Sequence, residues 1–340
     1  MTQAKLALSR DQVLAYRRRV GALDQRLPAG ADSLRTVAWA GLQDSMPRAA
    51  LLSIHARVQG TLPTSWADPA LVQVWGPRFS VYVVPALDHA HFTLGRYPDD
   101  ARGRQVAEDA AERVRAQLDG RRMGHHDLGE GLGVNPNSLK YATTTGTVLI
   151  RWEGARQPTV WIVPRPDIEP FAARVELSRR YLHVFGPATP LTFAEWAGIG
   201  AAQGLAAFDA LARELTPVRT PIGEGWILAS DEAMARRTPS TPAPARLLPS
   251  GDSYYLLWGA NRELLVPDAR GRGELWTSRV WPGALLVDGD VAGTWRRANQ
   301  NVSIQAWRKL TNAERGAVEA EASSLPLPGP PGPIRVRWEG

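Results

Sequence analysis

The chain has 340 residues, enough for two or three compact units that each bury a core, so a single small domain is excluded. Its hydrophobic fraction of 44% is ordinary, no apolar run is long enough to span a bilayer, and the first residues lack the layout of a secretion signal, which together predict a cytoplasmic protein without a membrane partner. The absence of cysteine excludes disulfides, thiolate metal sites and cysteine nucleophiles.

The positive charge of the chain is carried almost entirely by arginine. The net charge is +6, and only three of the 40 basic residues are lysines. The rigid fork of donors on arginine suits phosphates and base edges, which favours nucleic acid as a partner. A GC-rich genome that encodes arginine in place of lysine would produce the same composition. Charge alone leaves both explanations open.

The first hundred residues predict three short helices followed by a two-stranded ribbon. Ser9-Arg-Asp-Gln12 has the form of a capping box, and Gly76-Pro77-Arg78 reads as the turn of a hairpin. The predicted segments are 9–20, 34–42 and 49–58 for the helices, and 71–75 and 79–84 for the ribbon. This order is the plan of a winged helix-turn-helix motif.

The same order of elements recurs twice. The second copy comprises an amphipathic helix over 106–118, short helices over 126–132 and 137–145, and a ribbon of 148–152 and 159–163. The third comprises helices over 169–185, 192–196 and 205–215 and a ribbon of 218–220 and 226–228. We therefore expect three tandem winged-helix units, which are repeated in structure and not in sequence, with bounds 1–100, 101–166 and 167–237.

A proline-rich linker over 238–245 separates these units from a β-rich C-terminal part, 246–340. Short apolar runs divided by Gly, Asp and Asn predict strands at 254–258, 264–266, 284–288, 291–295, 302–307 and 334–338, with one helix at 312–323. This pattern favours a small antiparallel sheet or barrel. The predicted fold class is α+β.

Four stretches of the sequence resemble the AlkZ/YcaQ-type winged-helix DNA glycosylases of bacteria. They are Gly41-Leu-Gln-Asp-Ser-Met-Pro47, Phe185-Gly-Pro-Ala-Thr-Pro190 with Phe193 and Trp196, Arg246-Leu-Leu-Pro249 before Tyr254-Tyr-Leu-Leu257, and Trp281 to Arg297. The resemblance runs through most of the chain. It implies three tandem winged-helix motifs and a β-rich C-terminal unit that together hold duplex DNA on a basic concave surface.

The resemblance also implies a catalytic Gln-x-Gln or Gln-x-Asp motif with an aliphatic middle residue. Gln43 matches its first position, but Asp44 stands at the aliphatic position and Ser45 at the third. A second departure lies in the first ribbon, where many relatives carry histidine and this chain has Arg78-Phe-Ser-Val-Tyr82. Both departures concern catalysis, and neither concerns DNA binding.

Three arrangements of Gln43, Asp44 and Ser45 remain open. On an extended backbone Gln43 and Ser45 share one side and Asp44 points away. If the chain turns here, Asp44 joins Gln43 and supplies the missing polar group, which is the version we favour. In the third arrangement Asp44 or Ser45 only caps the helix that begins near Pro47. In the functional versions, Tyr82 and Arg78 line the site.

Several other residues are candidates for contact with DNA. Asn137, Ser138 and Lys140 open the predicted recognition helix of the second unit, where short polar groups suit phosphates, although such helices also merely pack. Arg296 and Arg297 stand beside the turn Asn299-Gln300-Asn301 and either reach DNA or form a charged strand edge. Arg48, next to the motif, completes this set. His125 and His126 lack a third ligand, so we expect no metal and no cofactor.

Three functional hypotheses follow. The first is a monofunctional DNA glycosylase that releases alkylated purines or unhooks interstrand crosslinks by water attack on the glycosidic bond. The second is a non-catalytic winged-helix DNA-binding protein that recognises lesions or regulates. The third is a binder that sequesters a genotoxin. For the first, the expected partner is double-stranded DNA with alkylated or crosslinked bases, and we expect a monomer in the bacterial cytoplasm, associated with the nucleoid.

Overall fold

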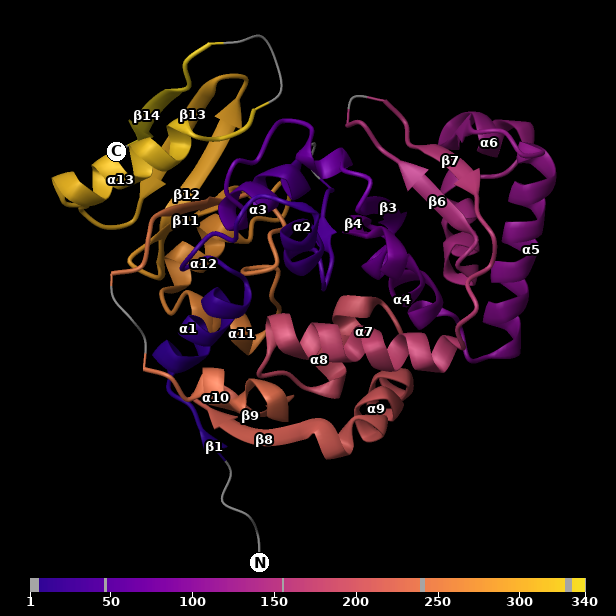
Figure 1. Cartoon of the computed structure of the whole chain (residues 1–340), viewed down its shortest axis with the longest axis horizontal. Coiled ribbons are helices and arrows are strands. Elements are labelled where there is room, and N and C mark those ends of the chain that lie inside the picture. Colours follow the sequence, from indigo (N-terminus) through magenta and orange to yellow (C-terminus); the bar gives the residue numbers. More distant parts are fainter. Residues whose placement is uncertain (1–5, 46–47, 155, 239–241, 328–331, 340) are drawn as a thin grey trace, which may run out of the picture.

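The computed structural model describes residues 6–45, 48–154, 156–238, 242–327 and 332–339. Along the chain, helices alternate with strands that form three β-sheets (Figure 1). The protein is therefore of the α+β class. Figure 1 shows the C-terminal sheet at the upper left, the first sheet and α5 at the right, and α7, α8 and α9 below them. In the part of the chain that the structure describes, no helix is long and apolar enough to cross a membrane.

The first sheet joins the ribbons of the first two predicted units. Its strands, in spatial order, are β2 (Leu42–Gln43), β4 (Val81–Pro85), β3 (Leu71–Trp75), β6 (Val148–Arg151), β7 (Thr159–Ile162) and β5 (Met123–Gly124). The predicted hairpin is confirmed as β3 and β4. The two ribbons meet where Gln73 of β3 pairs with Ile150 of β6. This contact makes one continuous sheet.

The helices around this sheet are α2 (Ala31–Val37), α3 (Ala49–Arg57), α4 (His89–Thr93), α5 (Ala101–Leu118) and α6 (His125–Gly131). Helix α5 is confirmed, and it begins where the side chain of Asp100 accepts a hydrogen bond from Gly103 N. Its buried stripe consists of Ala107, Ala111, Val114 and Leu118, while Val106 is exposed. An α-helix has 3.6 residues per turn, so residues spaced strictly by four do not stay on one face. The buried residues are therefore spaced by three or four.

The predicted recognition helix of the second unit is a different kind of helix. Residues Pro136–Thr145 form a 3-10 helix and not the expected α-helix. The hydroxyls of Thr144 and Thr145 donate to the carbonyls of Tyr141 and Ala142, three residues earlier. These bonds satisfy carbonyls that an α-helix would use, and β-branched residues are poor α-helix formers.

The second sheet combines the N-terminus with the third predicted unit. It contains β1 (Leu6–Ala7), parallel to β8 (Leu215–Thr220), which pairs with β9 (Gly223–Leu228). Its helices are α1 (Arg10–Val20), α7 (Pro170–Phe185), α8 (Pro190–Ala197), α9 (Ala201–Ala210) and α10 (Glu232–Ala235). The capping box at Ser9 and Gln12 is confirmed at the start of α1. Helix α1 packs beside α7 and α10, two helices that come much later in the sequence.

The third sheet corrects the predicted C-terminal unit. Its order is β10 (Arg246–Leu248), β11 (Gly283–Val287), β12 (Asp290–Ala298), β13 (Asn301–Ala306) and β14 (Arg335–Glu339). The last pair, β13 with β14, is parallel, and among the described residues β10 and β14 remain as two edges. The sheet is therefore open and mixed, neither a barrel nor purely antiparallel. Helix α13 (Asn312–Ser323) is confirmed, and residues 239–241 of the expected linker lie outside the described part.

Two predicted strands of this unit are wrong. Residues 254–258 form no strand, because Tyr254 N donates to Asp252 Oδ1 and Leu256 N donates to the Asp252 carbonyl. Those amides are not available to a β-ladder. Residues 264–266 fall at the end of helix α11 (Ala260–Leu265), which precedes α12 (Ala269–Leu275). Both runs are buried without alternation, a pattern that does not distinguish strand from turn or helix.

One hydrophobic cluster contains residues of all three sheets. Trp196 of α8 is fully buried in it, beside Tyr82 of β4, Tyr181 of α7 and Phe193. The same cluster contains Leu14 of α1 and Leu286 of β11. The three sheets are therefore fixed to one another by shared packing.

Candidate active site

The segment from Gln43 to Ser45, together with Arg48, lies between strand β4 and helix α3. Gln43 pairs with Tyr82 of β4, and the amide of Asp44 donates to the Val81 carbonyl at 2.8 Å. Arg48 then adopts a left-handed conformation, with φ at 68°, directly before α3. Met46 and Pro47 lie outside the described residues, so the helix start expected at Pro47 is described only from Arg48 onward.

Gln43 and Ser45 lie on the same side of this segment. Gln43 Nε2 donates a hydrogen bond of 2.6 Å to Ser45 Oγ, and the Ser45 side chain is exposed. Gln43 Oε1 is buried and has no hydrogen-bond partner within the described chain. The alternation of side chains along an extended backbone therefore produces an amide-hydroxyl pair, with one end of the amide still unsatisfied.

Asp44 points into the protein and does not join Gln43, which corrects the arrangement favoured from the sequence. Its exposure is 0%, Oδ1 accepts from Ala50 N at 3.0 Å, and Oδ2 accepts from Gln73 Nε2 at 3.0 Å. Burial raises the pKa of Asp44 to about 7, against the lowering effects of these hydrogen bonds and of Arg48, whose Nη1 lies 3.9 Å away. The carboxyl holds the first turn of α3, which agrees with the capping alternative.

Gln73 extends the contacts of Asp44 toward the second predicted unit. Its Oε1 accepts a hydrogen bond of 2.6 Å from the backbone amide of Trp152. Gln73 is itself buried at the junction of β3 and β6. The only sequence signal for Gln73 is its place as a polar residue inside an otherwise apolar strand, and it is not among the residues predicted above.

Neither proposed lining residue faces the Gln43–Ser45 pair. Tyr82 is 1% exposed and packs edge-on against Trp196, and burial raises the pKa of its hydroxyl. The Arg78 guanidinium stacks on the ring of Trp258, 4.3 Å from its centre, and lines a separate hollow. Tyr82 therefore supports Gln43 through the backbone pairing, and Arg78 belongs to another part of the surface.

Ser45 and Ala49 each border a hollow. Ser45 lines a hollow of about 390 Å³ together with Asn137 and Lys140 of the 3-10 helix. Ala49 lines another of about 430 Å³ together with Arg296 and Arg297 of β12. The structure thus brings candidates from three distant parts of the sequence to the two hollows beside the motif.

The basic side chains that line these hollows differ in their hydrogen bonds and ring contacts. Arg297 has no hydrogen bond or ion pair within the described residues, and burial lowers the pKa of its guanidinium. Arg296 donates to the Val280 carbonyl at 3.1 Å. Lys140 lies 5.9 Å from the ring of Trp75, and burial lowers its pKa. Arg297 and Lys140 are therefore the cations with most to gain from an anionic ligand.

Two further candidates, Arg48 and Ser138, are engaged within the protein. The Arg48 guanidinium lies 3.8 Å from the ring centre of Trp66 and donates to the Trp152 carbonyl at 3.3 Å. The Ser138 hydroxyl donates to the Asn135 carbonyl at 2.7 Å, as part of the turn that opens the 3-10 helix. Both contacts are those of structural residues.

A loop outside the predicted site covers Gln43. Gly251 has φ at +77°, and a Cβ built there would lie 3.3 Å from Gln43 Cδ. The next residue, Asp252, forms a buried bidentate ion pair with Arg57 of α3, with both N–O distances at 2.7 Å, and accepts from Ser53 Oγ. The signal was present as polar residues four apart, Ser53 and Arg57, on an apolar helix.

The described residues contain no group of three or more His, Asp or Glu side chains that could hold a metal ion. His125 is buried against the ring of Trp75 and contacts the Pro136 carbonyl through Nε2 at 2.7 Å. Its neighbour His126 is exposed. The pair is thus split between packing and solvent.

Comparison with known proteins adds three findings. A family model described as "DNA glycosylase AlkZ-like" matches residues 37–326. The chain is 29% identical over 165 residues to an interstrand DNA cross-link repair glycosylase of Streptomyces sahachiroi, a match that covers 46% of this chain and 43% of that relative. The matched region thus spans less than half of the curated relative.

The structure of the Streptomyces sahachiroi DNA glycosylase AlkZ superposes with a TM-score of 0.77 at 21% sequence identity, covering 98% of this chain and 100% of that one. At this identity the likeness establishes the fold alone.

Proposed function

The chain belongs to the AlkZ-like DNA glycosylase family, and from this premise we propose that it is a monofunctional glycosylase acting on alkylated or crosslinked purines in duplex DNA. The observation that carries the proposal is that Ser45 of the Gln43–Ser45 pair borders the hollow of Lys140, while Ala49, at the start of α3, borders the hollow of Arg297. A DNA strand that crosses the pair would bring its phosphates to both cations.

The reaction requires little catalysis from the Gln43–Ser45 pair. A purine alkylated at a ring nitrogen is cationic and leaves as a neutral base, so the enzyme has chiefly to place a water and stabilise an oxocarbenium-like sugar. Because Gln43 Nε2 donates to Ser45 Oγ, the exposed hydroxyl keeps a lone pair and its own proton for that water. Gln43 and Ser45 are the residues that touch the water in this proposal.

Asp44 acts in this proposal without touching the substrate. Its carboxyl lies beneath the pair and ionises near pH 7 because burial raises its pKa to about 7. A negative charge next to the site favours a developing sugar cation. We assign Asp44 this electrostatic role together with the positioning of α3.

We also propose the larger organisation expected from the sequence. Three helix-and-ribbon groups act as winged-helix units, with bounds near 1–100, 101–166 and 167–237, a linker at 238–245 and a C-terminal unit from 246 to 340. Arg48, Asn137, Ser138, Lys140, Arg296 and Arg297 lie along the DNA path. The protein works as a monomer in the cytoplasm, associated with the nucleoid.

A second function has its own support. Ser45 replaces the second amide or carboxylate of the family motif, and Asp44 is buried, so the site has fewer reactive groups than the motif provides. A non-catalytic lesion-binding protein would retain the two basic hollows and lose only the chemistry.

Incubation of the full chain with a duplex that carries one N7-methylguanine tests the proposal. A glycosylase releases free 7-methylguanine, detected by chromatography, and leaves an alkali-labile abasic site, while an unmodified duplex stays intact. Salt-sensitive binding without released base supports the non-catalytic protein and overturns the glycosylase. Affinity for a free DNA-alkylating compound without DNA identifies a genotoxin-sequestering protein.

A further inference from the structure

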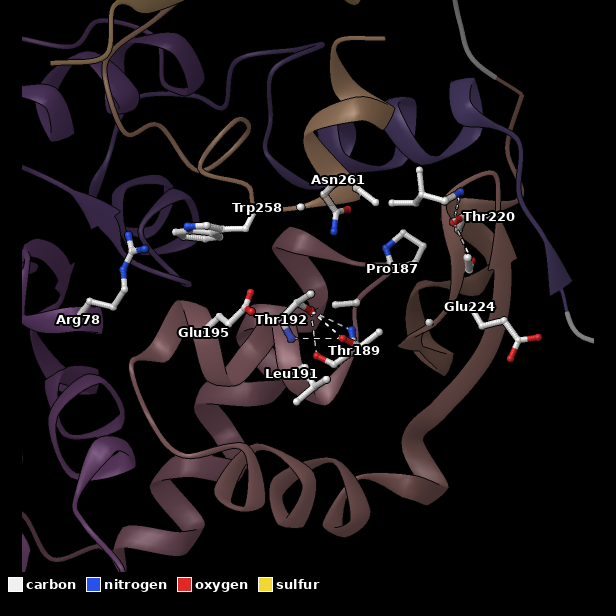
Figure 2. Close-up of a pocket in the computed structure, with 16 residues that line it drawn as sticks. Arg78, Pro187, Thr189, Leu191, Thr192, Glu195, Thr220, Glu224, Trp258 and Asn261 are labelled. Carbon is white, nitrogen blue, oxygen red and sulfur yellow. Dashed lines mark hydrogen bonds between the residues drawn. The ribbon is translucent and has the colours of Figure 1, made fainter. Parts of the chain in front are cut away.

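A hollow of about 750 Å³ lies outside the Gln43–Ser45 site (Figure 2). Its walls come from the turn between β3 and β4, the start of α8, the turn between β8 and β9, and the loop before α11. Segments from four parts of the sequence thus meet around it. Its volume is that of a pocket for a ligand of nucleoside size.

A tryptophan ring forms one wall of this hollow. Trp258 is partly buried, and the Arg78 guanidinium lies over it, 4.3 Å from the ring centre. Arg78 makes no hydrogen bond or ion pair within the described chain, so all five of its N–H donors remain for a ligand. An indole with a guanidinium beside it is a stacking surface for a flat heteroaromatic ring.

The orientation of Asn261 is determined by a buried arginine. Arg17 Nη2 donates to Asn261 Oδ1 at 2.7 Å, and the same guanidinium donates to the carbonyls of Phe185 and Gly186. Arginine can only donate, so the oxygen of the amide must face Arg17 and the NH₂ group must face the other way. Figure 2 shows that nitrogen directed into the hollow. Asn261 therefore offers donors to a ligand.

Glu195 supplies an acceptor opposite these donors. Its side chain is exposed, has no hydrogen bond or ion pair within the described residues, and points toward Trp258 in Figure 2. The hydroxyls of the walls are engaged elsewhere: Thr189 and Thr192 cap α8, and Thr220 donates to the Gly223 carbonyl. The unengaged groups are thus one carboxylate and two donors around an aromatic face.

We propose that this hollow binds a guanine-type base. Guanine presents the N1–H and N2–H₂ donors on one edge, which suit the Glu195 carboxylate, and the O6 and N7 acceptors on another, which suit Arg78 and Asn261. Stacking on Trp258 completes the set. Adenine presents its N1 acceptor where guanine has a donor, so it would oppose the carboxylate. A guanine alkylated at N7 keeps O6 and both donors.

The site is separate from the Gln43–Ser45 pair, and it rests on the proposed function only for the origin of the base, which the proposed reaction releases. Binding of free nucleosides requires no base release. Guanosine binding without base release from lesion DNA would support this inference and contradict the proposed function. Base release without guanosine binding would support the proposed function and contradict this inference.

Isothermal titration calorimetry of the full chain with guanosine, adenosine and 7-methylguanine tests the site. We expect guanosine to bind at least about tenfold more tightly than adenosine. We also expect 7-methylguanine to bind, because its O6 and its donors remain. Equal affinity for guanosine and adenosine, or heat from neither at millimolar concentration, would overturn the inference.

Two matched variants test whether guanosine binds in this hollow. Glu195→Gln replaces half of the acceptor by a donor, and we expect it to weaken guanosine binding by about tenfold or more. Glu224→Gln is the control, because Glu224 borders the same hollow but its carboxylate points away from it in Figure 2. Guanosine binding that is unchanged in Glu195→Gln, or weakened equally in both variants, would contradict the site. Both side chains are exposed, so neither change removes core packing.

Discussion

Gln43 and Asp44 are neighbours in sequence with opposite environments. Gln43 lies on the side of the exposed Ser45, while Asp44 is 0% exposed and bonded to Gln73 and the start of α3. The motif that the resemblance implies has an aliphatic residue at the position of Asp44, and the burial of this position suits an apolar side chain. The departure at Asp44 therefore changes the interior beneath the site and leaves the exposed groups as Gln43 and Ser45.

Gly251→Ala tests whether the loop above Gln43 positions its amide. The new methyl group would stand 3.3 Å from Gln43 Cδ at a φ of +77°, so we expect a stability loss of about 1 kcal/mol and a clear fall in the rate of base release. Urea unfolding and a base-release assay measure the two effects.

Gly120→Ala is the matched control, because Gly120 has φ at +75° and nothing within 4 Å of its would-be Cβ. It should lose similar stability and keep the wild-type rate. Equal rates for the two variants would show that contact with Gly251 does not matter to Gln43.

Asp44→Asn tests the buried carboxyl through pH. The folded pKa of Asp44, about 7, lies above the ordinary 3.8, so its contribution to stability is present below pH 3.8 and is lost as pH rises through 7. From pH 4 to pH 8, the free energy of unfolding of the variant should therefore rise relative to wild type, by up to roughly 4 kcal/mol. Urea unfolding at several pH values measures this difference.

The variant also carries a pH-independent loss, because its new amide donor meets the donor Gln73 Nε2. In the same pH range, base release by wild type should rise as the carboxylate forms, and release by Asp44→Asn should stay flat. Parallel pH profiles for the two proteins, in stability and in rate, would refute the role assigned to Asp44.

At the scale of elements, a buried ion pair fastens α3 to the C-terminal part. Arg57→Leu leaves Asp252 without its bidentate partner in a site where the two side chains are at most 2% exposed. We expect a loss of about 3–5 kcal/mol in the free energy of unfolding, because a buried charge is left unpaired. Urea denaturation measures it.

The control for this loss is Arg35→Leu, which breaks the exposed pair of Arg35 and Asp32. An exposed pair contributes at most about 1 kcal/mol. Comparable losses in the two arginine variants would mean that the Arg57–Asp252 pair does not fasten these elements.

The strand β12 carries the two arginines of the second hollow. Arg297→Ala should weaken duplex binding regardless of sequence and reduce the slope of log affinity against log salt by about 1, because one phosphate contact is lost. Arg296→Ala should act in the same direction. Fluorescence anisotropy with a labelled duplex at several salt concentrations measures both.

Arg113→Ala is the control for these variants, since Arg113 is exposed on α5, on the opposite side of the molecule from β12 in Figure 1. If the slope of log affinity against log salt is the same in all three variants, β12 does not contact the DNA.

Elements with a local chemical signal were predictable from the sequence. The capping box of Ser9 and Gln12 determines the start of α1, and the Gly76-Pro77 turn determines the β3–β4 hairpin. Tyr254 to Leu257 was not predictable, because its amides bond to Asp252, whose own position depends on Arg57, 195 residues earlier in the chain. The same holds for the hollow of Figure 2, whose walls come from four distant segments.

At the scale of the whole molecule, the basic residues fall into two structural groups. Arg17, Arg57, Arg96, Arg174 and Arg180 are almost fully buried and bond mainly to backbone carbonyls and carboxylates. They fix one segment to another and add nothing to a DNA-binding surface. Among the described residues, Arg296, Arg297 and Lys140 are the cations beside the motif that lack an acidic partner, so the charge available to DNA is local and does not follow from the net charge.

The central claim is that Gln43 takes part in releasing a base from DNA. Its most direct test is the single-turnover rate of 7-methylguanine release from a duplex with one N7-methylguanine, for wild type, Gln43→Ala and the exposed-glutamine control Gln105→Ala. We predict release by wild type and by Gln105→Ala at the same rate, and a rate roughly 100-fold lower for Gln43→Ala, because the group that orients the attacking water is lost. Release by Gln43→Ala as fast as by wild type would contradict the account.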